Sequence, residues 1–304
     1  MKFFRSKTAP QYDPDLTALT TDQADHLREL VRRYHAGIGV QATVSGQSVH
    51  RAEGASNLYN LAEFCRRAEP GEWPRLVERH FRALAGAAES TPDGQDDVLR
   101  CAYLRLIADD AIPAEMAPSF SYLRPVATGL LEALCLDLPE TVRTLDDRFV
   151  AEVGLERLRA AGRANLIADP VEFDVVEGPT ESSTLYAVTG DSMFVASKAL
   201  VLDELARAVT GRELPEEGAL FTVPSRDYLF FHPLTESKVA GAVNDLASIT
   251  LRVHSENPGP LSPRLYWWHQ GTVTNLTQID EARRSFSIVP PTELMAILRR
   301  LTDG

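Results

Sequence analysis

The chain has 304 residues, of which 44% are hydrophobic and 24% charged, and its formal net charge is −12. This composition excludes global disorder, and the length suffices for one large domain or two ordinary ones. The negative charge disfavours binding to nucleic-acid phosphates or anionic lipid, and it suits either a basic protein partner or simple solubility.

The cysteines indicate a reducing compartment. Cys65, Cys101 and Cys135 are widely spaced and form no Cys-x-x-Cys motif, so we expect buried thiols rather than disulfides or a zinc knuckle. Residues 1–15 lack the apolar run of a signal peptide, and no segment reaches the roughly 18 apolar residues of a membrane span. We therefore expect a cytoplasmic protein with no membrane segment.

The first third of the chain predicts helices and one hairpin. Residues 1–20 are expected to form a flexible leader, because Pro10 and Pro14 discourage a helix. Alternation around Ser45-Gly46 predicts a hairpin within residues 40–50. Apolar residues recur at helical spacing in three segments, residues 23–35 (with Asp22 as a candidate cap), 57–68 and 74–88.

The last of these helices carries His80 beside its apolar stripe. We expect this side chain to pack half-buried, because no other residue stands at metal-ligand spacing from it.

The remainder of the chain interleaves strands and helices. Strands are predicted over residues 98–108, 130–145 (one long strand or two around Leu138-Pro139), 172–178 and 184–190, and strand–turn–strand units over 221–233 and 264–276. Helices are predicted over residues 147–167, 191–211, 235–251 and 291–301.

This order of elements predicts an α+β fold with mixed or antiparallel sheets. A boundary near residue 117 is expected to separate two closely associated subdomains. The first, residues 21–117, would be mainly helical with a small hairpin, and the second, residues 118–304, would be α+β.

Four blocks of the second half follow one another in a recognisable order: LLEALCLDLPETVRTL, GLERLRAAGRANL, LYAVTGDSMFVASKALVLDEL and ALFTVPSRDYLFF. In this order the chain resembles the YtpQ-like family of bacterial proteins of unknown function, mainly over residues 95–235. The most specific parts are Asn165-Leu166, Gly190-Asp191, Ala196-Ser197 and Pro224-Ser225-Arg226-Asp227. The resemblance implies a bacterial, cytoplasmic origin, and it implies no reaction, cofactor or catalytic residue.

Residues 221–233, FTVPSRDYLFFHP, concentrate polar side chains between two aromatic segments. Pro presets the backbone of a turn, and Ser225 and Asp227 can bond nearby backbone N–H groups. One interpretation is a hairpin turn with an Arg226–Asp227 contact. The other is that the Arg226 guanidinium binds a carboxylate, a phosphate or a partner protein.

A second candidate lies where a strand passes into a helix after Gly190. Asp191 or Ser192 can cap this helix, and its first N–H groups suit an anion, to which Lys198 would add a cation. Ordinary capping is the alternative interpretation. A Gly-Asp-Ser esterase is disfavoured, because no Asp-x-x-His pair follows.

The third candidate is LYWWHQG, residues 265–271. In a strand, Tyr266 and Trp268 share one face while Trp267 and His269 share the other. Either helices cover both faces, or one face is an exposed interaction surface, self-association included.

The sequence contains no Gly-x-Ser-x-Gly elbow, Walker-type glycine loop or His-Glu-x-x-His motif. We therefore expect no catalytic residue, metal or cofactor, and a non-enzymatic protein that binds another, basic protein in a regulatory or immunity-like role. The alternative is an enzyme or small-ligand binder with an anion pocket between residues 190–198 and 224–227. In that pocket Asp191 or Asp227 would serve as base.

Overall fold

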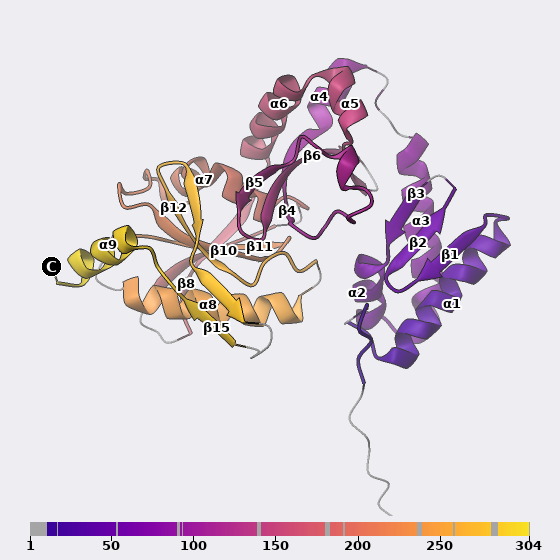
Figure 1. Ribbon diagram of the computed structural model, residues 1–304, viewed down its shortest axis with the longest axis horizontal. Helices are drawn as coiled ribbons and strands as arrows, with labels where there is room; N and C mark the ends of the chain where they lie inside the picture. The colour runs from indigo at the N-terminus through magenta and orange to yellow at the C-terminus, as the bar shows by residue number, and fades with distance from the viewer. Residues whose placement is uncertain are drawn as a thin grey trace, which may run out of the picture. The chain divides into compact units, whose positions relative to one another are not determined.

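The chain folds into helices and antiparallel sheets, which makes it an α+β protein as predicted; Figure 1 shows the computed structural model. The structure describes residues 11–16, 18–52, 54–89, 92, 94–138, 141–179, 183–190, 192–235, 239–257, 259–280 and 285–303. The chain divides into two compact units, Met1–Ser90 and Thr91–Gly304. This division precedes the boundary predicted near residue 117, because the strand that ends at Ala108 pairs within the second unit.

The first unit combines helices with a three-stranded antiparallel sheet in the order β1-β2-β3. Its elements are α1 (Thr21–Gly37), β1 (Ala42–Ser45), β2 (Ser48–Arg51), β3 (Gly54–Asn57), α2 (Tyr59–Arg67), η1 (Pro70–Glu72) and α3 (Trp73–Glu89). The predicted hairpin is confirmed, since Ser45 pairs with Ser48. Helix α1 begins with a capping box in which Thr20 and Gln23 exchange hydrogen bonds, whereas the sequence suggested Asp22 as the cap.

The predicted leader is wrong for its described part. Residues 1–10 lie outside the described residues, but Leu16 and Leu19 are buried in the core of the first unit. Asp13 is buried as well, and its two carboxylate oxygens accept hydrogen bonds of 2.8 and 3.0 Å from Arg28 of α1. Pro14 prevents a helix here without preventing the segment from packing.

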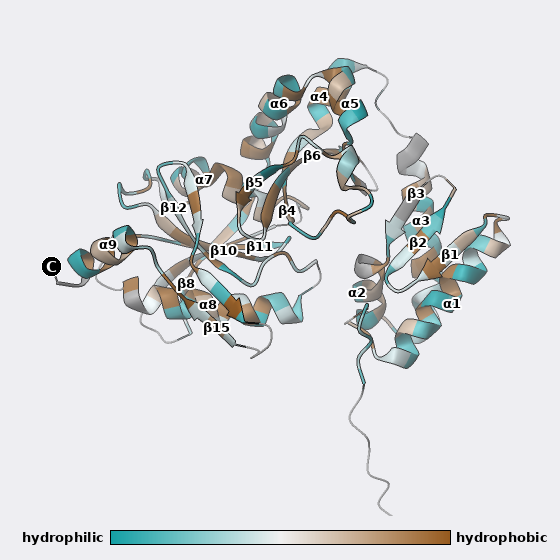
Figure 2. Cartoon of the chain, viewed as in Figure 1, coloured by the Kyte–Doolittle hydropathy of each residue, from teal (hydrophilic) through white to brown (hydrophobic). Residues whose placement is uncertain are grey.

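The larger sheet of the second unit has six strands in the order β13-β12-β10-β11-β9-β8. They are β8 (Glu172–Glu177), β9 (Thr184–Thr189), β10 (Ala219–Ser225), β11 (Tyr228–Pro233), β12 (Leu265–His269) and β13 (Thr272–Asn275). One face packs against η3 (Ala196–Val201) and α7 (Leu202–Thr210), and the other against α8 (Val239–Glu256) and α9 (Thr292–Asp303). Hydrophobic residues concentrate along these strands (Figure 2). Hydrophilic residues lie on exposed positions of the helices, for example on α1 of the first unit.

A second sheet of the same unit has the order β4-β6-β5, with β7 also paired to β6. Its strands and neighbouring helices are α4 (Gln95–Cys101), β4 (Ala102–Ala108), η2 (Ala117–Ser119), β5 (Arg124–Ala127), β6 (Leu130–Leu138), β7 (Thr141–Thr144), α5 (Asp147–Val153) and α6 (Leu155–Ala168). Leu106 and Leu130 join the core of the six-stranded sheet, so the two sheets share one hydrophobic cluster. A separate hairpin, β14 (Thr277–Asp280) and β15 (Ser285–Ile288), precedes α9.

Three predicted elements differ in the structure. The helix predicted over 147–167 is two helices, because Gly154 has φ of 102°, a conformation that interrupts a helix. The strand predicted over 98–108 begins only at Ala102 and follows α4. The helix predicted over 191–211 is a 3₁₀ helix from Ala196 followed by α7, and Gly211 ends it as predicted.

Candidate functional site

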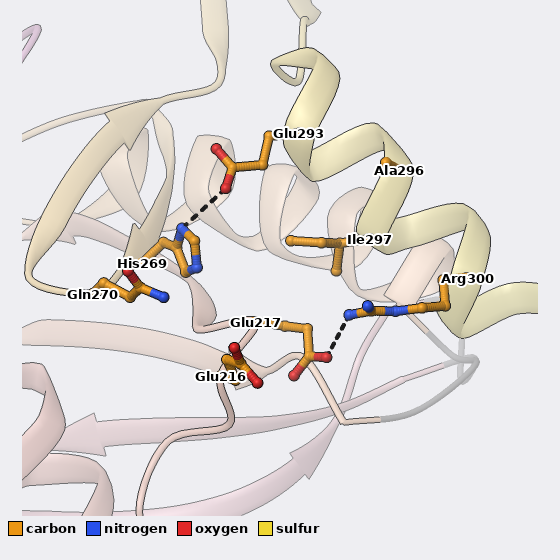
Figure 3. Close-up of a pocket in the computed structure, with 8 residues that line it drawn as sticks. All are labelled: Glu216, Glu217, His269, Gln270, Glu293, Ala296, Ile297 and Arg300. Atoms are coloured by element: carbon orange, nitrogen blue, oxygen red, sulfur yellow. Dashed lines mark hydrogen bonds and ion pairs between the residues drawn. The ribbon is translucent and has the colours of Figure 1, made fainter.

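A cleft of about 470 Å³ lies in the second unit between α9, the β12–β13 turn and the turn before β10 (Figure 3). We call it the acidic cleft, because three glutamates line it and one arginine. Its lining residues are Glu216, Glu217, His269, Gln270, Glu293, Ala296, Ile297 and Arg300.

The β12–β13 turn places His269 at one wall of the acidic cleft. His269 pairs with Thr272, so Gln270 and Gly271 alone form the turn. Their φ angles are 49° and 78°, and positive φ at both positions is what a type I′ hairpin turn requires. A positive φ is uncommon for a residue other than glycine, and at Gln270 the hairpin turn explains it.

The imidazole of His269 is held between a ring and a carboxylate. It stacks on Trp267 with ring centroids 4.6 Å apart and an angle of 12° between the planes. Its Nδ1 lies 3.7 Å from Oε1 of Glu293, which becomes an ion pair when the imidazole is protonated. Figure 3 shows this contact, with Ile297 pointing from α9 into the space beside it.

The opposite wall is a tight turn that presents Glu216 and Glu217. The N–H of Gly218 donates to the carbonyl of Pro215, and the indole N–H of Trp267 donates to the carbonyl of Glu217 at 2.9 Å. Arg300 of α9 reaches across and lies 2.6 Å from the Glu217 carboxylate. The turn before β10 is thus tied to α9 by an ion pair, and the β12–β13 turn by the contact between His269 and Glu293, which is charged only when the imidazole is protonated.

The charges of the acidic cleft do not balance. Glu216, Glu217 and Glu293 face a single guanidinium, that of Arg300, and His269 adds a positive charge only when protonated. The lining contains no hydroxyl or thiol that could act as a nucleophile. Such a site is suited to binding an amine or a guanidinium between carboxylates and an apolar wall.

The aromatic candidate of the sequence is only partly exposed. Tyr266 and Trp267 are 0% and 3% exposed, so of the two interpretations the covered strand, and not the exposed surface, describes these two residues. The reason is that β12 pairs with β10 and β13, while Tyr266 packs in the core on one face and Trp267 in the core on the other. Trp268 and His269 are half-buried, and His269 alone of these residues lines the acidic cleft.

At the second candidate, Asp191 lies outside the described residues. The hydroxyl of Ser192 donates to the Asp169 carboxylate at 2.5 Å and accepts the N–H of Phe194. The regular helix begins only at Ala196, and its first N–H already donates to the carbonyl of Arg226. The helix start is therefore engaged by the protein itself.

Lys198 is buried and points to the carboxyl end of α6. Its ammonium donates to the carbonyl oxygens of Leu166 (2.5 Å), Ile167 (3.4 Å) and Asp169. Burial lowers the pKa of Lys198, and the nearby Asp169 carboxylate opposes that effect. The cation thus satisfies the last carbonyls of a helix, a role that sequence spacing did not suggest.

The first candidate, residues 221–233, forms the predicted hairpin turn. Ser225 pairs with Tyr228, and Nε of Arg226 lies 3.3 Å from Oδ1 of Asp227, as the structural interpretation predicted. The Ser225 hydroxyl is fully buried, and within the described residues it has no hydrogen-bond partner. The bond between Ala196 and Arg226 brings this turn beside the start of η3, but the Lys198 ammonium points to α6.

Within the described residues, no group of three or more His, Cys, Asp or Glu side chains is arranged to hold a metal ion, and no helix is long and apolar enough to cross a bilayer. Fold and site together define an α+β protein with an acidic cleft. Comparison with protein-family models, characterised proteins and solved structures gave no match, so the YtpQ-like resemblance stays a prediction.

Sequence reasoning named His269 and missed the rest of the acidic cleft. Glu216 and Glu217 precede a strand, whereas Glu293 and Arg300 lie on the last helix. Segments this distant in the chain carry no spacing signal, although the i, i+4 stripe of Glu293 and Ile297 marks one face of α9.

Proposed function

We propose that this chain acts by binding another protein, and that the acidic cleft receives a Lys or Arg side chain of that partner. The observation that carries the proposal is that Glu216, Glu217 and Glu293 line one cleft together with the apolar side chain of Ile297. Carboxylates can hold the charged head of a long basic side chain while Ile297 packs against its stem. Glu293 is 65% exposed, so it is accessible to a partner.

Two properties of the whole chain support the same proposal. The net charge of −12 favours the approach of a basic protein. Cys65, Cys101 and Cys135 are free thiols, which suits a reducing compartment such as the cytoplasm. A regulatory or immunity-like role, in which the acidic protein neutralises a basic one, fits both the negative net charge and the free thiols.

The alternative of an anion-binding enzyme has less support. It requires Lys198 and Arg226 to face a common ligand. The Lys198 ammonium instead contacts main-chain carbonyls, and the Arg226 guanidinium contacts Asp227.

Charge reversal in the acidic cleft tests the proposal. Peptides are selected from a displayed random library on the immobilised full chain, and we expect Lys and Arg to be enriched among them. In the variant Glu216→Lys/Glu293→Lys, the affinity for a selected peptide is expected to fall at least about tenfold, measured by fluorescence anisotropy. The control is Glu152→Lys, which replaces one glutamate by lysine at an exposed position of α5 outside the cleft. The affinity of this variant for the peptide should lie within about twofold of that of the unmodified chain.

Two outcomes contradict the proposal. One is a set of selected peptides without basic residues. The other is binding that the cleft variant leaves unchanged, or that Glu152→Lys weakens as strongly.

A further inference from the structure

The outermost strand β8 has a free edge. Among the described residues β8 pairs only with β9, so the N–H and C=O groups along its other side have no strand partner. Phe173 and Val175 are 45% and 58% exposed, although both are large and apolar. An exposed edge of this kind is a template for another strand.

A groove runs beside this edge. It has a volume of about 290 Å³ and lies between β8, α7 and the carboxyl end of α6. Val171, Phe173, Leu205, Ala208 and Val209 contribute to its apolar lining. We call it the β8 groove.

The pleat of the sheet connects the edge to the groove. Phe173 and Val175 lie opposite Val188 and Tyr186 of β9, on the sheet face that α7 covers. Because neighbouring strands share their faces, alternate side chains of an added strand would point to the same side as Phe173 and enter the β8 groove. Apolar side chains suit that position.

Three of the other four side chains of β8 are acidic, and the fourth is Val176. Glu172 and Asp174 lie on the opposite face of the strand, and Glu177 follows at its end; all three are exposed. The remaining side chains of an added strand would lie beside Glu172 and Asp174, where Lys or Arg gains a favourable cross-strand pair. Two copies of β8 would instead bring their carboxylates into one ladder, so self-pairing is disfavoured.

We propose that β8 and the β8 groove bind an extended segment of a partner protein in which apolar residues alternate with Lys or Arg. The segment adds a strand to the sheet, its apolar side chains enter the groove, and its basic side chains face Glu172 and Asp174. This surface shares no residue with the acidic cleft, and the proposal does not rest on that site.

The test uses a short synthetic peptide that alternates Val with Lys, and a matched peptide that alternates Val with Glu, titrated against the full chain by fluorescence anisotropy. We expect the Lys peptide to bind at least about tenfold more tightly than the Glu peptide. Hydrogen exchange should show new protection of those amides of Glu172–Glu177 that point away from β9, because these groups acquire strand partners in the complex.

Two variants and one control locate the site. Ala208→Arg fills the groove from an exposed position of α7, and Asp174→Lys reverses a charge on the edge; each should weaken the Lys peptide at least about tenfold. Ala151→Arg makes the same change as Ala208→Arg at an exposed position of α5 outside the groove, and should leave binding unchanged.

The proposal is overturned if the Lys peptide does not bind, or if its protection maps to residues 216–217 and 293–300 instead of β8. It is also overturned if Ala151→Arg weakens binding as much as Ala208→Arg. Sedimentation that shows a dimer lost in Asp174→Lys would assign the edge to a second copy of the chain.

Discussion

Two sets of buried polar contacts, one from each unit, differ in the kind of partner. In the first unit Asp13 pairs with Arg28, and His35 and His80 pack against Phe81. In the second unit the Lys198 ammonium and the Trp267 indole donate to backbone carbonyls, although the buried Glu132 also pairs there with Arg124 and Arg159.

This difference predicts different vulnerabilities. A buried ion pair or a buried imidazole depends on the protonation of its own groups, so the first unit should respond to charge substitutions and to acid. A side chain that bonds to carbonyls depends on where the backbone lies, so the second unit should respond most to changes that displace a strand or a turn. Three substitutions test this contrast.

The largest effect is expected for Gly218→Ala in the second unit. A Cβ at this position would lie 1.9 Å from the carbonyl oxygen of Trp268, and the φ of Gly218 is 84°. The substitution must therefore displace β12 or the turn that carries Glu217, and we expect a loss of about 4 kcal/mol in the free energy of unfolding, measured with urea. Gly211→Ala is the matched control, because its φ is 71° and nothing lies within 4 Å of the added Cβ.

That control should lose only about 1 kcal/mol, the cost of the left-handed conformation alone. If the two substitutions lower the free energy of unfolding equally, steric contact between the added Cβ and the backbone does not determine the stability of the second unit.

A smaller loss is expected for Arg28→Ala in the first unit. Asp13 is 4% exposed, and the hydrogen bond from Arg28 holds its pKa below the ordinary value despite burial. Removing Arg28 leaves a buried carboxylate without its main partner, which should cost about 3 kcal/mol. Hydrogen exchange resolved to the amides of α1 measures the loss within the first unit.

Arg33→Ala is its control. Arg33 pairs with Glu29 four residues away on the same helix, and both side chains are exposed. Such a pair contributes at most about 0.5 kcal/mol. A loss at Arg28 no larger than at Arg33 would contradict the contrast between the units.

The sequence predicted the parts of the fold that depend on local periodicity. Alternation identified the hairpins at Ser45-Gly46 and at residues 221–233, and helical spacing identified α1 and α9. It did not reveal that β4 pairs with β6, which places the division of the chain near Ser90. Pairing across a loop leaves no local pattern, and the division of the chain into two compact units therefore precedes the boundary predicted near residue 117.

The candidate site was predictable to a smaller extent. His269 stood out because it follows two tryptophans, but the side chains that complete the acidic cleft come from other segments and were not identified. The role of Lys198 was missed for a related reason. Its partners are carbonyl oxygens of α6, and any residue type supplies a carbonyl, so the sequence cannot mark them.

The smallest expected effect concerns acid and His80. Burial, together with the charge of Arg51, lowers the pKa of His80 from 6.5 to about 4. As the pH falls through 6.5 the unfolded chain takes up a proton that the folded first unit does not bind until about pH 4. The free energy of unfolding therefore falls as the pH decreases from 6.5 to about 4, and His80 does not change it at higher pH.

Because His80 is half-buried, we expect a loss of about 1–2 kcal/mol between pH 7.5 and 4.5 rather than the full value of the shift. His80→Leu should reduce this loss, while His50→Leu, at an exposed position of β2, should leave it unchanged. His254 gives the second unit a dependence of the same sign, since burial lowers its pKa too. The measurement must therefore use hydrogen exchange at the amides of α3, with exchange rates corrected for pH. If His80→Leu leaves the loss of stability at these amides unchanged, the acid sensitivity of the first unit belongs to His35, because burial lowers the pKa of His35 as well.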